Sequence, residues 1–507
     1  MEGILSNLAL GFQVTFTPFN MLVGFLGVVL GMIFGLLPGL GPLNGVAILL
    51  PVTFVLPPES SMIFIAAIYY AGTAGGAITS ISLNIPGTPM AAATCLDGHP
   101  MAKKGEGALA IFVAATASLI GGTLACVGFV FLAPPLARYA LAFGPCDYFA
   151  LMILAYACFA GLGGKSVTKT VIMTIFGLIV SCVGMDVISG NPRVTFGYMG
   201  FYNAITFLTA VVGMFGIGEV LVTIEKGIKA EIIHPDVKWK DYVQAWKLIW
   251  KHRVLVLSDT VLGFLVGVLP AAGATPASFM SYGFSKSFSR RSKEWGTGVP
   301  EGVMATESSN HAASTGAFVP MVTLGIPGSP LAAIVLGGML IWGLVPGPRL
   351  FIEQPRFVWG LIACGFIVNI LAYIFEVSLV PFLMKVLKTP FTIMTPIIAI
   401  FCLITGYVQN FGMVEVWEVL IFGILGYFCK KTDYPVAPFI LALVLGPMTE
   451  YALRQSLLQS DGSLMIFVTH PISLTLLIIS IFLYAFPITK GVVEGRRSKR
   501  EAMEAKS

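Results

Sequence analysis

The chain has 507 residues, of which 56% are hydrophobic and only 11% are charged, and its formal net charge is +5. A soluble protein carries roughly 25% charged residues, so this composition excludes a soluble globular protein. The basic residues gather in short loops and in the C-terminal tail, as in membrane proteins, and we expect no nucleic-acid partner.

Uncharged segments long enough to cross a bilayer follow one another along the chain. They occupy residues 20–37, 108–136, 171–185, 201–217, 312–348, 357–375, 391–414 and 464–489, and segment 255–285 contains one carboxylate, Asp259. The series predicts an all-α polytopic membrane protein with about 10–12 transmembrane helices. No cationic segment precedes the first apolar run, so we expect no cleavable signal peptide. The scattered cysteines are interpreted as small membrane residues.

Two sequence patterns each occur twice in the same order, so the chain contains an internal duplication. Residues 31–41 and 263–273 share the pattern Gly-x-x-x-Gly-x-Leu-Pro-x-x-Gly, and residues 83–92 (LNIPGTPMAA) return as 324–333 (LGIPGSPLAA). The offsets are 232 (263 minus 31) and 241 (324 minus 83), which an insertion of nine residues explains. The glycine pairs are typical of closely packed membrane helices. We call segments 37–41 and 269–273 the breaks, and segments 85–89 and 326–330 the tips.

The distribution of Lys and Arg predicts how the chain crosses the membrane. Segment 225–253 contains seven of them and the tail is also basic, so both should be cytoplasmic. The segment before the first span has neither, which predicts a periplasmic N-terminus. The two halves should then cross in opposite directions, as an inverted repeat does. We divide the chain into a first repeat half (1–224), a basic cytoplasmic linker (225–253), a second repeat half (254–489) and a basic cytoplasmic tail (490–507).

The breaks and tips should interrupt helices, because proline removes a backbone donor and glycine permits conformations that other residues avoid. An interrupted helix cannot face lipid, since its peptide groups would stay unsatisfied, so we expect buried re-entrant loops. A helix that restarts after a break offers free N–H groups, which bind carboxylates. The loop carbonyl groups offer oxygen ligands for Na⁺. Paired re-entrant tips also motivate the hypothesis of an elevator-type motion.

Small polar residues crowd these interruptions, and we assign them to two candidate sites. A carboxylate substrate is expected at Asn44, Thr73, Asn84, Gly87, Thr88, Asn310, Ser314, Gly328 and Ser329. A coupling cation is expected at Gly39, Gly41, Asn44, Gly273, Thr275, Glu307 and Ser309. For any single Ser or Thr, a hydrogen bond to its own helix backbone remains the alternative.

Glu307 stands out among the charged residues, because a carboxylate inside a membrane is costly and is usually functional. It could bind a cation or a proton, or it could pair with a basic residue near the surface, and both interpretations stay open. His311 is interpreted as a hydrogen-bond donor. Asp97, with its charged neighbours, is interpreted as part of a solvated loop.

The chain contains no His-Glu-x-x-His, Gly-x-Ser-x-Gly or Walker A sequence. We therefore expect a transporter rather than an enzyme, with no cofactor and with Na⁺ or H⁺ as the coupling ion. The alternative is an ion-conducting channel with Pro-Gly pore loops. A membrane-embedded enzyme is a third class, which the missing motifs disfavour.

The combined motifs resemble the large membrane subunit of bacterial tripartite tricarboxylate transporters, the TctA family. The resemblance rests on residues 35–42, 70–76, 83–89, 302–312 and 324–330, and it extends over nearly the whole chain. It implies a translocation path for a di- or tricarboxylate such as citrate in the bacterial inner membrane. It also implies two partners, a small membrane subunit and a periplasmic solute-binding protein, and it leaves homodimerisation open. Residues 307–311 read Glu-Ser-Ser-Asn-His where the family favours Glu-x-x-Asn-Asn.

Overall fold

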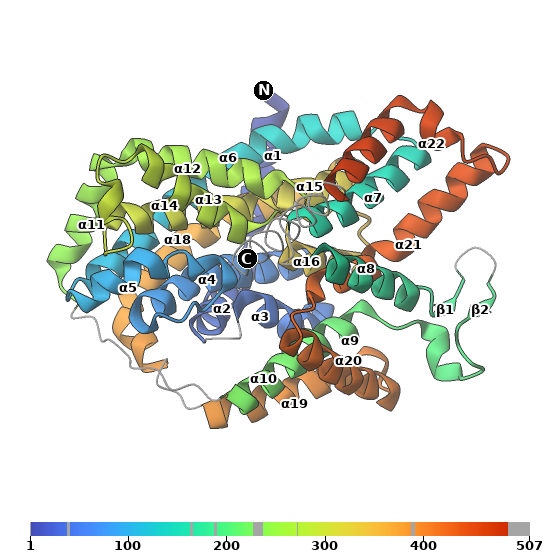
Figure 1. The fold of residues 1–507 in the computed structure, drawn as a ribbon, viewed down its shortest axis with the longest axis horizontal. Helices are drawn as coiled ribbons and strands as arrows, with labels where there is room; N and C mark the ends of the chain where they lie inside the picture. Colours follow the sequence, from blue (N-terminus) through green and yellow to red (C-terminus); the bar gives the residue numbers. More distant parts are fainter. Residues whose placement is uncertain are drawn as a thin grey trace, which may run out of the picture. The chain divides into compact units, whose positions relative to one another are not determined.

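The computed structural model describes residues 2–37, 41–162, 166–186, 190–226, 237–270, 272–386 and 391–484. Within these ranges the chain is almost wholly helical, apart from one antiparallel pair of strands, β1 (Gly184–Met185) and β2 (Pro192–Arg193) (Figure 1). Six helices are long and apolar enough to cross a membrane, and six shorter apolar helices accompany them. The prediction of an all-α polytopic membrane protein is confirmed. Long helices alone do not supply the predicted number of spans, because several apolar segments are broken into shorter helices.

The chain divides into two compact units, which we describe separately. Unit 1 comprises Met1–Leu141 and Leu208–Phe428, and unit 2 comprises Ala142–Phe207 and Cys429–Ser507. Each unit takes chain from both predicted halves, so the units do not follow the repeat boundaries, which stay a prediction. The basic tail lies outside the described residues. The predicted linker contains a helix, α11, that we did not expect.

The helices can be listed according to the two copies of the internal duplication. The first repeat contains α1 (Glu2–Thr15), α2 (Pro18–Leu36), α3 (Gly41–Leu49), η1 (Leu50–Val55), α4 (Pro58–Leu83), η2 (Pro89–Ala92), α5 (Cys95–Lys103) and α6 (Gly107–Ala140). The second contains α11 (Trp239–Lys251), α12 (Arg253–Val268), α13 (Ala274–Phe288), η5 (Ser292–Glu294), α14 (Pro300–Gly316), α15 (Phe318–Leu324), α16 (Pro330–Ile341), α17 (Leu350–Glu353) and α18 (Pro355–Val386).

The remaining elements flank the repeats or form unit 2. Most of α9 (Phe207–Val211) and α20 (Met413–Lys431) belongs to unit 1, together with the π-helical turn η4 (Val212–Ile217), α10 (Gly218–Lys226) and α19 (Phe391–Asn410). Unit 2 contains α7 (Pro145–Leu162), α8 (Val167–Ser181), the two strands, η3 (Met199–Asn203), α21 (Val436–Gln459), α22 (Ile466–Thr469) and the helix Pro471–Tyr484.

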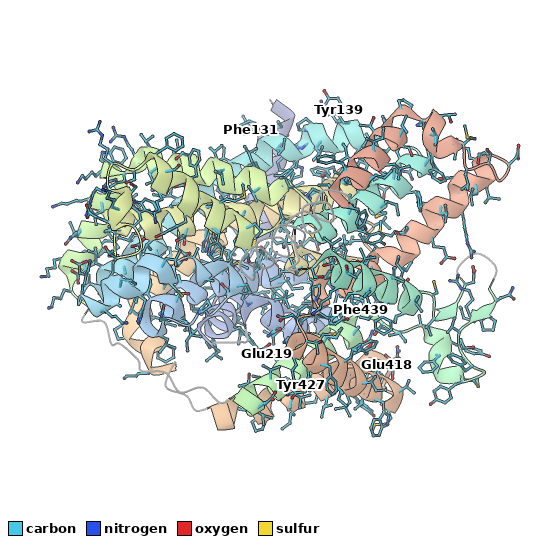
Figure 2. The ribbon with its side chains drawn as sticks, in the orientation of Figure 1. Phe131, Tyr139, Glu219, Glu418, Tyr427 and Phe439 are labelled. Atoms are coloured by element: carbon cyan, nitrogen blue, oxygen red, sulfur yellow. The ribbon has the colours of Figure 1, made fainter. Side chains whose placement is uncertain are left out.

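Large apolar side chains remain exposed on the long helices. On α6, the side chains of Phe131 and Tyr139 are 57% and 77% exposed (Figure 2). In water such exposure would favour aggregation, whereas lipid is an apolar solvent for these side chains. The exposed rings therefore agree with a helix whose outer side faces the bilayer.

Glycines bring the first long helix of each repeat against the backbone of the second long helix. The equivalent contacts are Gly31 with Ile68, Gly35 with Gly72, Gly263 with Ser309, and Gly267 with Ala313. A Cβ at Gly31 would lie 2.6 Å from the Cα of Ile68, and a Cβ at Gly263 would lie 2.6 Å from the Cα of Ser309. These contacts repeat at the two offsets of the sequence patterns. The interpretation of the glycine pairs as close helix packing is confirmed.

The two repeats run in opposite directions where their equivalent helices meet. In α6, Gly122 lies against Asn369 of α18, and Cys126 lies against both Asn369 and Gly365. Residue numbers therefore rise along α6 while they fall along α18. Because α6 and α18 follow the tips of their respective repeats, their antiparallel packing agrees with the predicted inverted repeat.

We predict that Gly267→Ala destabilises the protein. The added Cβ would lie 2.6 Å from the Cα of Ala313, so the two helices would have to separate. Overpacking of this kind typically costs about 1–3 kcal/mol. The measurement is the unfolding temperature of the purified chain in detergent. The matched control is Gly283→Ala in the exposed part of α13, where an added Cβ has no neighbour within 4 Å. Equal unfolding temperatures for the two variants would contradict the prediction.

Candidate functional site

Each tip lies against the last glycine of the break in its own repeat. Gly41 (φ 62°) would place a Cβ 3.5 Å from the carbonyl oxygen of Gly87. At the equivalent position, Gly273 (φ 66°) would place a Cβ 3.5 Å from the Cβ of Ser329 and 3.8 Å from the carbonyl oxygen of Gly328. Left-handed backbone favours glycine, so the sequence pattern and the geometry agree at both positions.

A threonine hydroxyl bonds a free carbonyl group at the C-terminal end of α2, the first interrupted helix. The Oγ1 of Thr79 donates a hydrogen bond of 2.8 Å to the carbonyl oxygen of Leu36, where α2 ends. The last carbonyl groups of a helix have no partner within the helix, so this bond replaces one that the break removes. A Cβ at Gly87 would lie 3.2 Å from the same hydroxyl, which places the first tip beside the helix end.

The tips also connect the two repeats. The short helix η2, which follows the first tip, packs against α13, the helix that restarts after the second break. In the reciprocal contact, α16 follows the second tip and packs against α3, which restarts after the first break. The described residues of the breaks and tips, together with the elements that follow them, therefore form one connected set of contacts within unit 1.

The hydroxyl residues of the tips cap the elements that follow them. The Oγ1 of Thr88 accepts a hydrogen bond of 3.2 Å from the backbone N–H of Ala91, and the Oγ of Ser329 accepts one of 3.2 Å from Ala332. These caps satisfy one N–H group each. The remaining N–H groups at the start of α16, which has twelve residues, are the type of donor that binds a carboxylate.

Helix α14 carries polar side chains in complete burial. The carboxyl group of Glu307 accepts a hydrogen bond from Thr94 Oγ1 and one of 3.3 Å from Ser118 Oγ. Asn310 Nδ2 lies 3.5 Å away, and His311 Nδ1 lies 3.9 Å away. No described Lys or Arg lies within 4.0 Å of this carboxyl group. The interpretation of Glu307 as half of a surface ion pair with a basic residue is therefore wrong.

Three buried oxygen atoms on the same helix have no hydrogen-bond partner among the described residues. They are Ser308 Oγ, Ser309 Oγ and Asn310 Oδ1. An unsatisfied buried polar atom costs about 1–3 kcal/mol, so three of them on one helix call for a functional explanation. Hydroxyl and amide oxygens are ligands that hard cations prefer, and the hydroxyl groups can also donate to a carboxylate. Asn310 and Ser314 are one helical turn apart, and Ser314 lies beside Tyr69 of α4.

A family model described as the tripartite tricarboxylate transporter TctA family matches residues 21–441. The chain belongs to this family. As a TctA member it is a subunit of a tricarboxylate transporter, which points away from an enzyme and toward assembly with other subunits.

Two proteins of Agrobacterium vitis are similar to this TctA member. One, described as an uncharacterized 52.8 kDa protein in the TAR-I ttuC' 3' region, is 37% identical over 504 residues, which covers 99% of both chains. The other, an uncharacterized protein in the TAR-II ttuC' 3' region, is 37% identical over 239 residues, or 47% of this chain and 97% of its own. No solved structure matches.

The structure gives several of the predicted residues structural roles. Asn44 is buried on α3, and Thr275 is half-buried in the first turn of α13. Thr73 donates a 2.9 Å hydrogen bond to the carbonyl oxygen of Tyr69 in its own helix. Gly39 lies outside the described residues. All of these remain predictions as ligands.

Asn84 has a clear backbone role. It ends α4 in the left-handed conformation (φ 56°, ψ 25°), and Gly325 ends α15 in the same way (φ 74°, ψ 20°). Glycine and asparagine are the residues that adopt this conformation at helix ends. The Asn84 side chain is exposed, so the cap explains the residue, and its contact with substrate remains a prediction.

The interpretation of Asp97 as part of a solvated loop is wrong. It is buried, and its Oδ1 accepts hydrogen bonds from the backbone N–H groups of Gly296 (2.9 Å), Gly298 (2.8 Å) and Val299 (2.9 Å). Its Oδ2 accepts a bond of 2.9 Å from the hydroxyl of Tyr282. A carboxylate at the start of α14 also interacts favourably with the partial positive charge of that helix end. Asp97 is therefore a buried link between the repeats rather than part of a solvated loop.

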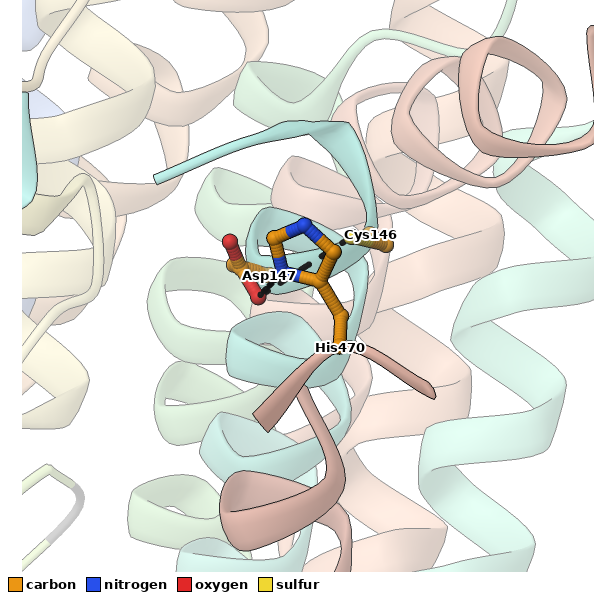
Figure 3. A group of neighbouring side chains, drawn as sticks. All are labelled: Cys146, Asp147 and His470. Carbon is orange, nitrogen blue, oxygen red and sulfur yellow. Dashed lines mark hydrogen bonds and ion pairs between the residues drawn. The ribbon is translucent and has the colours of Figure 1, made fainter. Parts of the chain in front are cut away.

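A second group of titratable side chains lies in unit 2 (Figure 3). The ligand-type atoms of Cys146, Asp147 and His470 all lie within 4.8 Å of one another. Asp147 Oδ2 accepts a hydrogen bond of 2.9 Å from Gly144 N–H, and Oδ1 lies 3.3 Å from His470 Nδ1. A carboxylate that caps the start of α7 and pairs with a histidine accounts for these contacts. We therefore assign no metal to this group.

We predict that Thr94→Val destabilises the protein, because it removes the hydroxyl that donates to the Glu307 carboxyl group. A buried polar atom that loses its partner costs about 1–3 kcal/mol. The measurement is again the unfolding temperature in detergent. The control is Thr260→Val, because the buried hydroxyl of Thr260 bonds only the carbonyl oxygen of Val256 in its own helix, at 2.7 Å. A larger loss in the control variant would show that the contact with Glu307 is unimportant for stability.

Proposed function

We propose that this chain forms the translocation path of a cation-coupled uptake system for di- or tricarboxylates such as citrate. It works with a small membrane subunit and with a periplasmic binding protein that delivers the substrate. Membership of the TctA family supports the transporter class. The observation that carries the proposal is that each tip lies against the glycine at the end of its break, and that Tyr69 lies beside both Ser314 of α14 and Ser329 of the second tip.

The proposed site binds the substrate and the cation with two different sets of groups. The substrate carboxylates bind at the N–H groups of the tips and at Asn310 and Ser314. The cation binds at oxygen atoms of the breaks, of Ser309 and of Glu307. This division matches each ligand to its chemistry, since carboxylates need donors and hard cations need oxygen acceptors.

The distribution of lysines supports an orientation in the bacterial inner membrane with a periplasmic N-terminus and a cytoplasmic C-terminus. Lysines lie at the start of α6 and α8 and at the end of α18 and α20, at positions 103, 104, 169, 385, 430 and 431. In the proposed orientation all of these helix ends are cytoplasmic, together with α11. Arginines lie at the opposite ends of α6 (138) and α18 (356), and also in β2 (193), before α17 (349) and in α21 (454), segments that this orientation assigns to the periplasmic side. Positive charge is enriched on the cytoplasmic side of membrane proteins.

Electrostatics gives the coupling a physical reason. Moving one charge through 100 mV costs about 2.3 kcal/mol, so a trianion entering a negative-inside cell is opposed by roughly 7 kcal/mol. Cotransport of three cations removes this opposition, and a fourth makes the potential favourable. We therefore expect several Na⁺ or H⁺ for each substrate molecule.

The motion that we propose is of the elevator type, in which the tips and their ligands slide against a scaffold. The motivation is that each tip is a loop packed between helices instead of a complete span. Crosslinks that fix both tips to the scaffold should stop uptake. Full uptake by the crosslinked protein would contradict this motion.

We predict that proteoliposomes containing this chain and its small partner take up radiolabelled citrate or a related dicarboxylate. Uptake should require the binding protein outside and an imposed Na⁺ or proton gradient, because the trianion cannot enter against the potential alone. The measurement is the initial rate with each gradient in turn and with both collapsed. Currents that need no binding protein would instead favour a channel with Pro-Gly pore loops.

We predict that Ser314→Ala lowers the uptake rate at least tenfold, because one lost hydrogen bond to a charged group is worth about 1.5–3 kcal/mol. The control is Ser287→Ala, whose exposed hydroxyl donates to the carbonyl oxygen of Phe284 in the same helix at 2.7 Å. Both variants should fold, and unfolding temperatures should verify this. Normal uptake by Ser314→Ala would remove this hydroxyl from the substrate site.

A further inference from the structure

Helix α11 (Trp239–Lys251) has three faces of different chemistry. The first face contains Ala245 and Ile249, which are buried against the protein. The second face exposes apolar side chains, namely Trp239 (76%), Val243 (38%), Trp246 (37%) and Trp250 (73%). The third face exposes Lys240, Gln244, Lys247 and Lys251. Both exposed sets have the spacing of four, three and four residues that forms a stripe along a helix.

A groove runs beside the boundary between the apolar and the basic face. It is a shallow, open depression of about 550 Å³, and its lining residues all belong to α11: Tyr242, Val243, Trp246, Lys247 and Trp250. Four of the five lining side chains are aromatic or aliphatic, and the fifth is a lysine. A ligand that fits this lining has an apolar part and an anionic part.

The next helix shows where α11 lies with respect to lipid. Helix α12 begins two residues after α11 ends, and it exposes an apolar stripe formed by Val254, Leu257, Val261 and Leu265. Such a stripe on a membrane helix faces acyl chains. Because α11 immediately precedes this stripe, it has the place in the chain that is expected of a helix at the border of the bilayer; α11 is labelled in Figure 1.

We propose that α11 is an interfacial helix whose groove binds an anionic phospholipid. The lysines of the third face contact the phosphate headgroup, and the tryptophans and Val243 contact the upper part of the acyl chains. Tryptophan is enriched at the membrane interface, and basic amphipathic helices bind anionic lipid through apolar area together with charge. The helix carries Lys240, Lys247 and Lys251 against one acid, Asp241, so its charge is complementary to this ligand.

The internal duplication provides a comparison within the molecule. Helix α1 begins the first repeat as α11 begins the second, and α1 packs on α18 as α11 packs on α6. Residues 2–15 contain no Lys or Arg. The two equivalent helices therefore differ in the charge that an anionic headgroup requires, and the lipid site belongs to α11 alone.

The groove is connected to the core of unit 1. Trp246 Nε1 donates a hydrogen bond of 2.9 Å to the hydroxyl of Tyr373 on α18, and the ring of Tyr242 stands edge-on to Phe112 of α6, with centroids 6.1 Å apart. A lipid bound in the groove therefore contacts side chains that connect the two antiparallel helices α6 and α18. Binding should stabilise this part of the protein, since a ligand that binds only the folded state raises its stability.

The experiment measures the unfolding temperature of the full-length chain in detergent with added phosphatidylglycerol or phosphatidylcholine. Phosphatidylglycerol should raise this temperature, and phosphatidylcholine should raise it less. The variant Lys247→Gln/Lys251→Gln should lose the difference, with an affinity for phosphatidylglycerol about 10- to 30-fold lower, because each lysine near an anionic lipid contributes about 1 kcal/mol. The control is Lys103→Gln/Lys104→Gln, which removes the same charge from exposed positions outside α11 and should keep the difference.

Three results would overturn the proposal. An unchanged response of Lys247→Gln/Lys251→Gln would show that the lysines do not bind the headgroup. If Lys103→Gln/Lys104→Gln lost the difference between the two lipids to the same extent, the effect would come from net charge in general. Equal stabilisation by the two lipids would indicate an apolar groove without headgroup selection, which another hydrophobic partner could occupy. A second measurement, quenching of Trp239, Trp246 and Trp250 by brominated acyl chains in a variant with the other four tryptophans changed to phenylalanine, should detect shallow burial.

Discussion

The main constraint on this structure is that a helix interrupted inside a bilayer leaves peptide groups that lipid cannot satisfy. Both breaks and both tips contain such interruptions, and the protein satisfies or covers them with its own groups. Thr79 bonds the carbonyl oxygen of Leu36, Thr88 and Ser329 cap the elements after the tips, and Gly41 and Gly273 allow the tips to approach. The glycine contacts between long helices follow from the same need, because a broken segment is covered only if its neighbours come close.

This constraint explains why the two repeats depend on each other. Each tip rests on its own break, but η2 packs on α13 and α16 packs on α3 of the opposite repeat. The insertion that separates the two offsets falls between the second break and α14, in the segment that also contains Gly296, Gly298 and Val299. These residues donate to Asp97 of the first repeat. This segment thus adds a polar connection between halves that Thr94 and Ser118 also join through Glu307.

The sequence predicted the features that depend on local pattern. The duplication, the broken helices and the glycine packing follow from residues close together in the chain, and the opposite direction of the halves followed from the positions of Lys and Arg. It did not predict contacts that long-range packing creates. Asp97 resembles a loop residue because its partners lie about 200 positions away. Thr94 and Asp97 share one face of α5, and this spacing was the available signal. Helix α11 was overlooked because its charges were interpreted as a linker, although its tryptophans and lysines repeat with helical spacing.

The equivalent positions of the two repeats differ in chemistry where the ligands are expected. At the offset of 241, Glu307, Asn310 and Ser314 correspond to Ala66, Tyr69 and Thr73. Thr73 bonds its own helix, whereas the hydroxyl of Ser314 lies beside Tyr69 of the first repeat. At these three positions the first repeat therefore provides side chains that line the proposed site, and the second provides the polar groups that are expected to bind the ligands. An inverted repeat requires the backbone to be duplicated so that two related conformations exist, but it does not require the charge to be duplicated. At these positions the first repeat adds no further carboxylate to that of Glu307, whose burial already carries a desolvation cost.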